Sequence, residues 1–157
     1  MDNFRTKTNY FILEDGKRNI WVNLLASSPG KTLEKRWGKL FGLIEIENSN
    51  PKIQELINII FKELESKYYS LEKYENIGPE EIENNFQNSL QKINLMITSY
   101  IESQHIDLDL AKINATLGVI ANRQLIFSQI GKINIYLLQN LKKGEYRIVD
   151  ILEASKT

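Results

Sequence analysis

Residues 113–138, INATLGVIANRQLIFSQIGKINIYLL, decide the fold of this chain. They hold three short apolar runs, and two or three residues separate each run from the next. β-Branched and aromatic residues dominate the runs, and turn formers occupy the breaks. We therefore predict a three-stranded antiparallel meander with strands at 113–120, 124–130 and 133–138. The first strand is apolar at nearly every position, which predicts that both of its faces are covered.

Three more strands and then two helices are predicted upstream of this meander. A hairpin with a turn at Asp15-Gly16 is expected to join the first two strands, and a polar loop at 26–37 to lead to the third. Asn50 and Pro51 begin one amphipathic helix, and Gly78-Pro79 begins a longer one that ends near Gln104. The predicted strands are 8–14, 19–25 and 39–46.

The remaining segments complete an α+β chain. Residues 71–77 are predicted to be a charged connector, 105–112 a loop, 142–145 a hairpin turn and 146–152 a last strand. Strands and helices are segregated along the chain rather than alternating. We predict one domain over residues 1–157, a largely antiparallel β-sheet sandwich with two long amphipathic helices packed on it.

Composition excludes several classes of function. The 20 basic residues balance the 20 acidic ones, whereas a nucleic-acid binder usually carries a basic excess. The absence of cysteine excludes disulfides and thiol catalysis, and a single histidine excludes a histidine-rich metal site. No run of about 18 apolar residues is present, and the first residues lack the apolar core of a signal peptide. We expect a cytoplasmic protein with no cofactor, no membrane segment and no nucleic-acid partner.

Two segments resemble the metal-dependent Ser/Thr protein phosphatases of the type 2C (PPM) family. One is LFGLIEI at 40–46, with the helix after it; the other begins with NATL at 114–117 and ends with IGKINIYL at 130–137. In that family a strand ending in Asp-Gly precedes two helices, a strand with a Gly-x-Thr element, and a hairpin leading to Gly-Asp-Ser-Arg-x-Tyr-Leu. Thr116, Gly131 and Tyr136 match these elements, and the element order agrees over about 40–152. The resemblance implies a PPM-like fold.

The positions that hold metal in that family differ here. Glu45 and Ile46 replace the Asp-Gly whose oxygens bind two metal ions, and hard divalent cations need such oxygen ligands. Lys132 and Asn134 replace the Asp and Arg of the later element, so positive charge stands where carboxylates should be. The family's N-terminal phosphate-binding residues and its C-terminal ligand motifs have no counterpart. The resemblance therefore implies a shortened relative without a catalytic or metal site. Its degenerate positions are Glu45, Ile46, Thr116, Gly131, Lys132 and Asn134.

Other residue groups have both a functional and a structural interpretation. Gly30-Lys31-Thr32 is similar to the end of a P-loop, but Leu25 stands where the motif needs glycine. We favour a chance match in a loop, helix capping for His105, and no role for Ser27-Ser28. A basic cluster beside Trp37 could bind phosphate or an acidic partner, and a group of acids could bind a metal, although a solvated loop explains each. The two groups are Lys31, Lys35, Arg36 and Lys39, and Glu45, Glu47, Asp107 and Asp109.

The sequence thus predicts a non-catalytic, pseudophosphatase-like regulatory or scaffolding module that binds a protein partner or itself. An incomplete sheet would expose an edge or a face that such a partner covers. Two alternatives remain open. One is a divergent metal-dependent phosphohydrolase in which Glu45 survives as a ligand, and the other is a structural subunit of a larger assembly.

Overall fold

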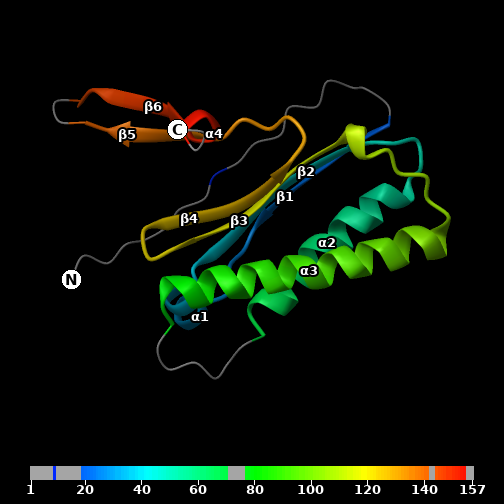
Figure 1. Cartoon of the computed structure of the whole chain (residues 1–157), viewed down its shortest axis with the longest axis horizontal. Helices are drawn as coiled ribbons and strands as arrows, with labels where there is room; N and C mark the ends of the chain where they lie inside the picture. The colour runs from blue at the N-terminus through cyan, green and yellow to red at the C-terminus, as the bar shows by residue number, and fades with distance from the viewer. Residues whose placement is uncertain (1–8, 10–18, 71–76, 142–143, 155–157) are drawn as a thin grey trace.

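The computed structural model describes residue 9 and residues 19–70, 77–141 and 144–154, which form an α+β structure (Figure 1). A four-stranded antiparallel sheet has the order β1-β2-β3-β4, and a second sheet consists of β5 and β6. The elements are β1 Ile20–Ala26, α1 Lys31–Trp37, β2 Lys39–Glu47, α2 Lys52–Tyr68, α3 Pro79–Gln104, the 3-10 turn η1 Leu110–Lys112, β3 Ile113–Ala121, β4 Gln124–Ile130, β5 Tyr136–Asn140, β6 Tyr146–Asp150 and α4 Ile151–Ala154.

The two long helices form the connection between the two central strands. The chain leaves the sheet at the end of β2, runs through α2 and α3, and returns as β3, which pairs antiparallel with β2 from Lys39↔Ile120 to Ile46↔Ile113. Asn50 Oδ1 accepts a hydrogen bond from the Lys52 amide (3.0 Å) and so caps α2. The predicted bounds of both helices agree with the structure to within about a residue.

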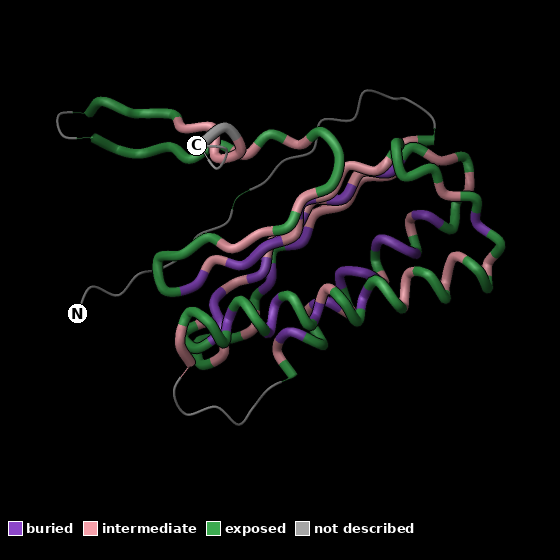
Figure 2. The backbone as a smooth tube through the Cα atoms, viewed as in Figure 1, coloured by how far each residue is buried: buried purple, intermediate pink, exposed green. Residues whose placement is uncertain are grey.

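Both helices cover the same face of the four-stranded sheet (Figures 1 and 2). Burial alternates along β2, where Leu40, Ile44 and Ile46 are buried towards the helices while Phe41 and Leu43 are half-buried on the other face. In β3, Val119 on one face and Thr116 on the other are both buried, as predicted. The apolar stripe of α2 is buried and consists of Ile53, Leu56, Ile57, Ile60, Phe61, Leu64 and Tyr68.

The predicted loop at 26–37 is wrong in part, because Lys31–Trp37 forms the short helix α1. Leu33 and Trp37 are four residues apart and therefore lie on one side of this helix. Trp37 is only 1% exposed, and its ring centroid lies 6.0 Å from that of Tyr68, whose hydroxyl donates to the Trp37 carbonyl (2.6 Å). Burial of Trp37 thus stabilises a helix too short to be stable alone.

The three-stranded meander predicted for 113–138 is also wrong in its last strand. β3 and β4 pair as expected, but the chain turns away at Gly131, which has a φ of 78°. The Gln129 side-chain amide then donates to the Ile133 carbonyl (2.6 Å), which holds the segment after the turn against β4. The next strand begins only at Tyr136 and pairs with β6 instead of β4.

Smaller differences occur at the ends of elements. The predicted last strand, 146–152, ends at Asp150, where the Asp150 carboxylate accepts from the Leu152 amide (3.0 Å) and α4 begins. The loop at 105–112 contains the turn η1. The predicted strand at 8–14, apart from Asn9, the connector at 71–76 and residues 142–143 of the hairpin turn lie outside the described residues.

Candidate functional site

The two segments that carry the phosphatase resemblance lie side by side, and one side chain joins them. Glu45 of β2 stands opposite Asn114 of β3, and Asn114 Nδ2 donates to Glu45 Oε1 (2.7 Å). Asn114 Oδ1 accepts from the backbone N–H of Lys132 (2.7 Å), directly after the Gly131 turn. We call this pair of hydrogen bonds the Asn114 bridge. One oxygen of the Glu45 carboxylate therefore accepts from the Asn114 amide N–H. This N–H group itself cannot bind a cation.

The other degenerate positions do not converge on Glu45. The Ile46 side chain is buried on the helix-covered face, while Asn134 and Lys132 are exposed. Thr116 is buried two residues beyond Asn114, on the same face of β3. Within the described parts of the chain, no group of three or more His, Cys, Asp or Glu side chains is placed to hold a metal ion.

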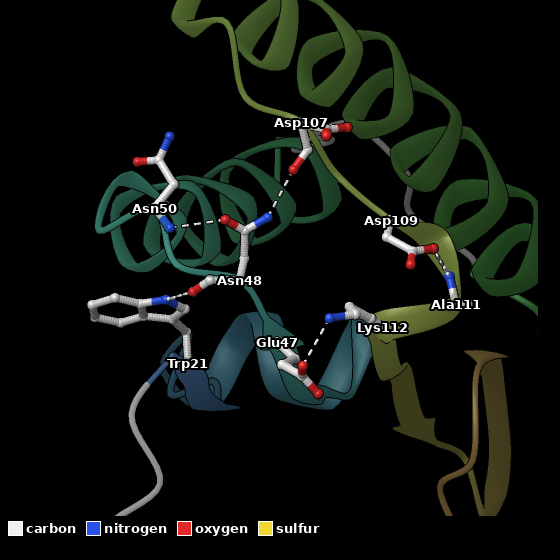
Figure 3. Close-up of polar contacts among 8 residues, drawn as sticks. All are labelled: Trp21, Glu47, Asn48, Asn50, Asp107, Asp109, Ala111 and Lys112. Carbon is white, nitrogen blue, oxygen red and sulfur yellow. Dashed lines mark hydrogen bonds and ion pairs between the residues drawn. The ribbon is translucent and has the colours of Figure 1, made fainter.

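The predicted acidic group is divided among separate structural contacts at the end of the sheet (Figure 3). Glu47 forms an ion pair with Lys112 (2.8 Å), and this hydrogen bond raises the pKa of the Lys112 ammonium group. Asp109 accepts from the Ala111 amide (2.9 Å) and so caps η1, whereas Asp107 contributes only its backbone carbonyl. Glu47 and Asp109 therefore bond to different partners, and the acids share no common centre among the described residues.

Asn48 organises the same end of the sheet, although the sequence did not single it out. Its Nδ2 donates to the Asp107 carbonyl (2.8 Å), its Oδ1 accepts from the Asn50 amide (2.9 Å), and its carbonyl accepts from the Trp21 indole N–H (2.8 Å). These bonds join β1, the start of α2 and the segment before β3 (Figure 3). The only sequence signal was an asparagine between a strand and a helix, where side-chain caps are common.

The predicted basic cluster on α1 lacks the aromatic surface expected beside it. Lys31, Lys35 and Arg36 are exposed, and Lys39 lies 3.5 Å from Glu34, but Trp37 is buried beneath them. The P-loop-like Gly30-Lys31-Thr32 forms the start of this seven-residue helix. His105 ends α3 in the left-handed conformation, with a φ of 52°, and its amide donates to the Glu102 carbonyl (3.2 Å). It therefore occupies the capping position that we predicted.

Ser27, to which the sequence assigned no role, lies in a buried hydrogen-bond network. Its hydroxyl is 2.8 Å from the Tyr69 hydroxyl and accepts from the Leu40 amide (2.8 Å). Burial raises the pKa of the Tyr69 hydroxyl, although the hydrogen bonds to Ser27 and Leu40 partly oppose this effect. Because the partners are far apart in the chain, local sequence patterns contain no signal for this network.

The hairpin of β5 and β6 carries the main exposed apolar surface of the described structure. Among the described strands, these two pair only with each other, and the hairpin extends beyond the four-stranded sheet (Figures 1 and 2). The register places Leu138 opposite Ile148. The apolar residues on this side, which we call the hairpin face, are Tyr136 (58% exposed), Leu138 (60%), Tyr146 (61%) and Ile148 (69%).

Comparisons with known proteins identify no family for this chain. No protein-family model matches the sequence, and no curated protein or solved structure is significantly similar to it. No helix in the described ranges is both long and apolar enough to cross a membrane.

Proposed function

We propose that this chain is a non-catalytic, cytoplasmic protein-binding module, a shortened and degenerate relative of the PPM phosphatases. The element order supports this relation, because two central antiparallel strands are joined through two helices that cover one face of the sheet. The contact between the regions of Glu45 and Lys132 supports it as well, since a relation between these segments requires them to be neighbours in space.

The Asn114 bridge is the observation that carries the non-catalytic part of the proposal. A bridging metal pair needs several carboxylate and carbonyl oxygens around it, and it activates the attacking water. Here Asn114 Nδ2 lies 2.7 Å from Glu45 Oε1 and donates to it, and the backbone N–H of Lys132 donates to Asn114 Oδ1. Two hydrogen bonds thus join these segments, and one of them uses a Glu45 oxygen that a metal ion would need as a ligand.

The hairpin face supports the protein-binding part. Soluble monomers seldom expose a contiguous group of large apolar side chains unless a partner covers it. Two of the four residues are tyrosines, which are enriched among the side chains that dominate binding energy at interfaces. An isolated two-stranded hairpin is also marginally stable in water, so a docking partner would stabilise this element.

A manganese titration combined with a phosphatase assay tests the absence of catalysis. We expect wild type, Glu45→Ala and Glu47→Ala to give the same calorimetric baseline and the same background hydrolysis of an aryl phosphate. Glu47 is the matched control, because it is a neighbouring acid that pairs with Lys112 instead of Asn114. Metal-stimulated turnover that disappears in Glu45→Ala but persists in Glu47→Ala would establish the divergent phosphohydrolase instead.

A further inference from the structure

β4 forms one edge of the four-stranded sheet, and its sequence lacks the features that usually protect an edge (Figure 1). The strand, QLIFSQI at 124–130, contains no charged residue and no proline, the residues with which natural proteins block edge pairing. The segment after β4 leaves the edge free, because Ile133 lines a hollow on the face of the sheet together with Leu24 and Leu43. Among the described residues, the edge of β4 is therefore open to another strand.

The turn between β3 and β4 determines which backbone groups point outwards from this edge. Both turn residues, 122–123, have a positive φ (48° and 65°), as in the two-residue type I′ hairpin, in which the residues flanking the turn form a hydrogen-bonded pair. Because bonded and non-bonded pairs alternate in an antiparallel ladder, every second residue of β4 from Gln124 onwards bonds to β3. The N–H and C=O groups of Leu125, Phe127 and Gln129 therefore point away from β3.

The same alternation accounts for hydrogen bonds at the other edge of the sheet. It directs the backbone groups of Leu40 towards β1, and the Ser27 amide donates to the Leu40 carbonyl (3.0 Å). It also directs the Leu24 amide away from β2, and this N–H donates to Asn23 Oδ1 (2.8 Å). A side chain therefore occupies an outward donor of β1, whereas no described residue bonds to the outward backbone groups of β4.

We propose that β4 pairs with β4 of a second copy of this chain and joins the two sheets into one antiparallel sheet. A two-fold axis at Phe127 places Phe127 opposite Phe127 of the second copy, and Leu125 opposite Gln129. In this register each outward N–H meets an outward C=O, and the two rings form an aromatic cross-strand pair. The strand is thus complementary to itself, which favours a second copy over an unrelated chain. The formal net charge of zero adds no long-range repulsion.

The helices leave room for this arrangement. α3 packs against β3, so the two copies of α3 lie on the same side of the joined sheet, about 14 Å or three strand spacings apart. Packed helices need only about 8–10 Å between their axes. One pair of strands buries less than the roughly 1,600 Å² of a standard interface, so we expect an affinity in the micromolar range. This interface goes beyond the proposed function, because it does not use the hairpin face.

Sedimentation of the whole chain, combined with hydrogen exchange, tests the pairing. From micromolar to millimolar concentration we expect the mass to rise from 18.3 kDa towards twice that value. Over the same range the amides of Leu125, Phe127 and Gln129 should exchange about tenfold more slowly or less. The amides of Ile126 and Ser128, which bond to β3, should be protected at every concentration. This alternation identifies both the strand and the edge that pairs.

Ser128→Lys should weaken the association by about tenfold, because it places a lysine of each copy at the paired edge, close to the lysine of the other. Ser128 is exposed, so the substitution disturbs no packed contact. Ser103→Lys is the matched control, because it adds the same charge at an exposed serine of α3, whose hydroxyl bonds to the Tyr100 carbonyl (2.9 Å). It should keep the wild-type affinity. Leu138→Lys with Ile148→Lys should keep it as well, so failure of this proposal is distinguishable from failure of the hairpin face.

Three results would each overturn the proposal. One is a constant mass of 18.3 kDa, and another is protection that rises elsewhere in the chain but not at Leu125, Phe127 and Gln129. The third is the same affinity in Ser128→Lys as in Ser103→Lys. The exchange pattern of the wild type needs no variant, so it decides even if Ser128→Lys does not fold.

Discussion

Asn114 shows how one neutral side chain can join three segments of the chain. Its amide presents a donor to Glu45 and an acceptor to the Lys132 backbone, so the junction of β2, β3 and the turn after β4 is held without a second charge. An asparagine suits this position because only an amide side chain offers a donor and an acceptor at this length. Exchange of its nitrogen for oxygen is therefore the most informative substitution at this site.

We expect Asn114→Asp to lower the free energy of unfolding at pH 7 by about 1–3 kcal/mol, because a second carboxylate would face Glu45. Protonation of one acid removes this repulsion, so the loss of stability relative to wild type should be smaller at pH 4 than at pH 7. Urea unfolding at pH 4 and pH 7 measures this, with exposed Asn94→Asp as the control. The same pH response in both variants would contradict the hydrogen bond between Asn114 and Glu45.

Gly131 and Gly144 allow a matched test of the turn beside the Asn114 bridge. Both have a φ of 78°, so alanine is strained by about 1 kcal/mol or more at either position. A side chain at Gly131 would collide with the Ile113 carbonyl and the Asn114 side chain, whereas a side chain at Gly144 would meet nothing within 4 Å. We expect Gly131→Ala to reduce stability by at least 2 kcal/mol more than Gly144→Ala in urea unfolding. Equal losses would show that the turn adapts.

Among the helices and strands, hydrophobic periodicity predicted those elements whose buried face can be recognised from the spacing of apolar residues. The α2 stripe from Ile53 to Tyr68 is buried as its spacing of three and four residues requires. The short helix α1 was missed, because only contacts with residues distant in the chain, such as that between Trp37 and Tyr68, stabilise it. Residues 133–135 were predicted to be a strand from their β-branched composition, but after the Gly131 turn they form no ladder with β4 and are bonded to it by the Gln129 side chain. Composition does not specify a strand's partner.

The candidate site was also predicted only in part. The sequence indicated Glu45 and Lys132 through the resemblance, and the structure places their segments in contact. Asn114 belongs to the matched segment, but its bridging role was not predicted. Its two hydrogen-bond partners are 69 and 18 residues away along the chain. A contact of this kind depends on the register between β2 and β3, which the sequence alone did not provide.

The junction of α2 with β2 predicts a specific response to alkali. Burial raises the pKa of both Tyr68 and Tyr69 above the ordinary value of 10.0, so the folded state keeps their protons where the unfolded state loses them. The contribution of these two tyrosines to stability is therefore constant up to about pH 10 and falls as the pH rises further. Urea midpoints between pH 7 and pH 11.5 should show this decline, and Tyr69→Phe should reduce it. Tyr146→Phe, on the exposed hairpin, should not. If the decline is unchanged in Tyr69→Phe, ionisation of Tyr69 is not a cause of the loss of stability in alkali.

At the scale of the whole molecule, the two sheets are in different energetic situations. β2 and β3 are central strands that pair on both sides and pack on two helices, so their backbone hydrogen bonds open only when the domain unfolds. In the described part of the chain, β5 and β6 pair only with each other, and most of their apolar residues are exposed. Burial of one large aliphatic side chain is worth about 1.5–3 kcal/mol, so the hairpin lacks most of the stabilisation that its composition can supply.

Hydrogen exchange makes this difference measurable. In dilute solution we expect the amides of β5 and β6 to exchange at least a hundredfold faster than those of β2 and β3, because the isolated hairpin opens locally. When the chain is concentrated or its partner is added, protection of the hairpin should rise as the hairpin face becomes covered. Leu138→Lys with Ile148→Lys should abolish that rise while leaving the free energy of unfolding within about 0.5 kcal/mol, since both residues are exposed. A hairpin as strongly protected as β2 in dilute solution would mean that it needs no partner.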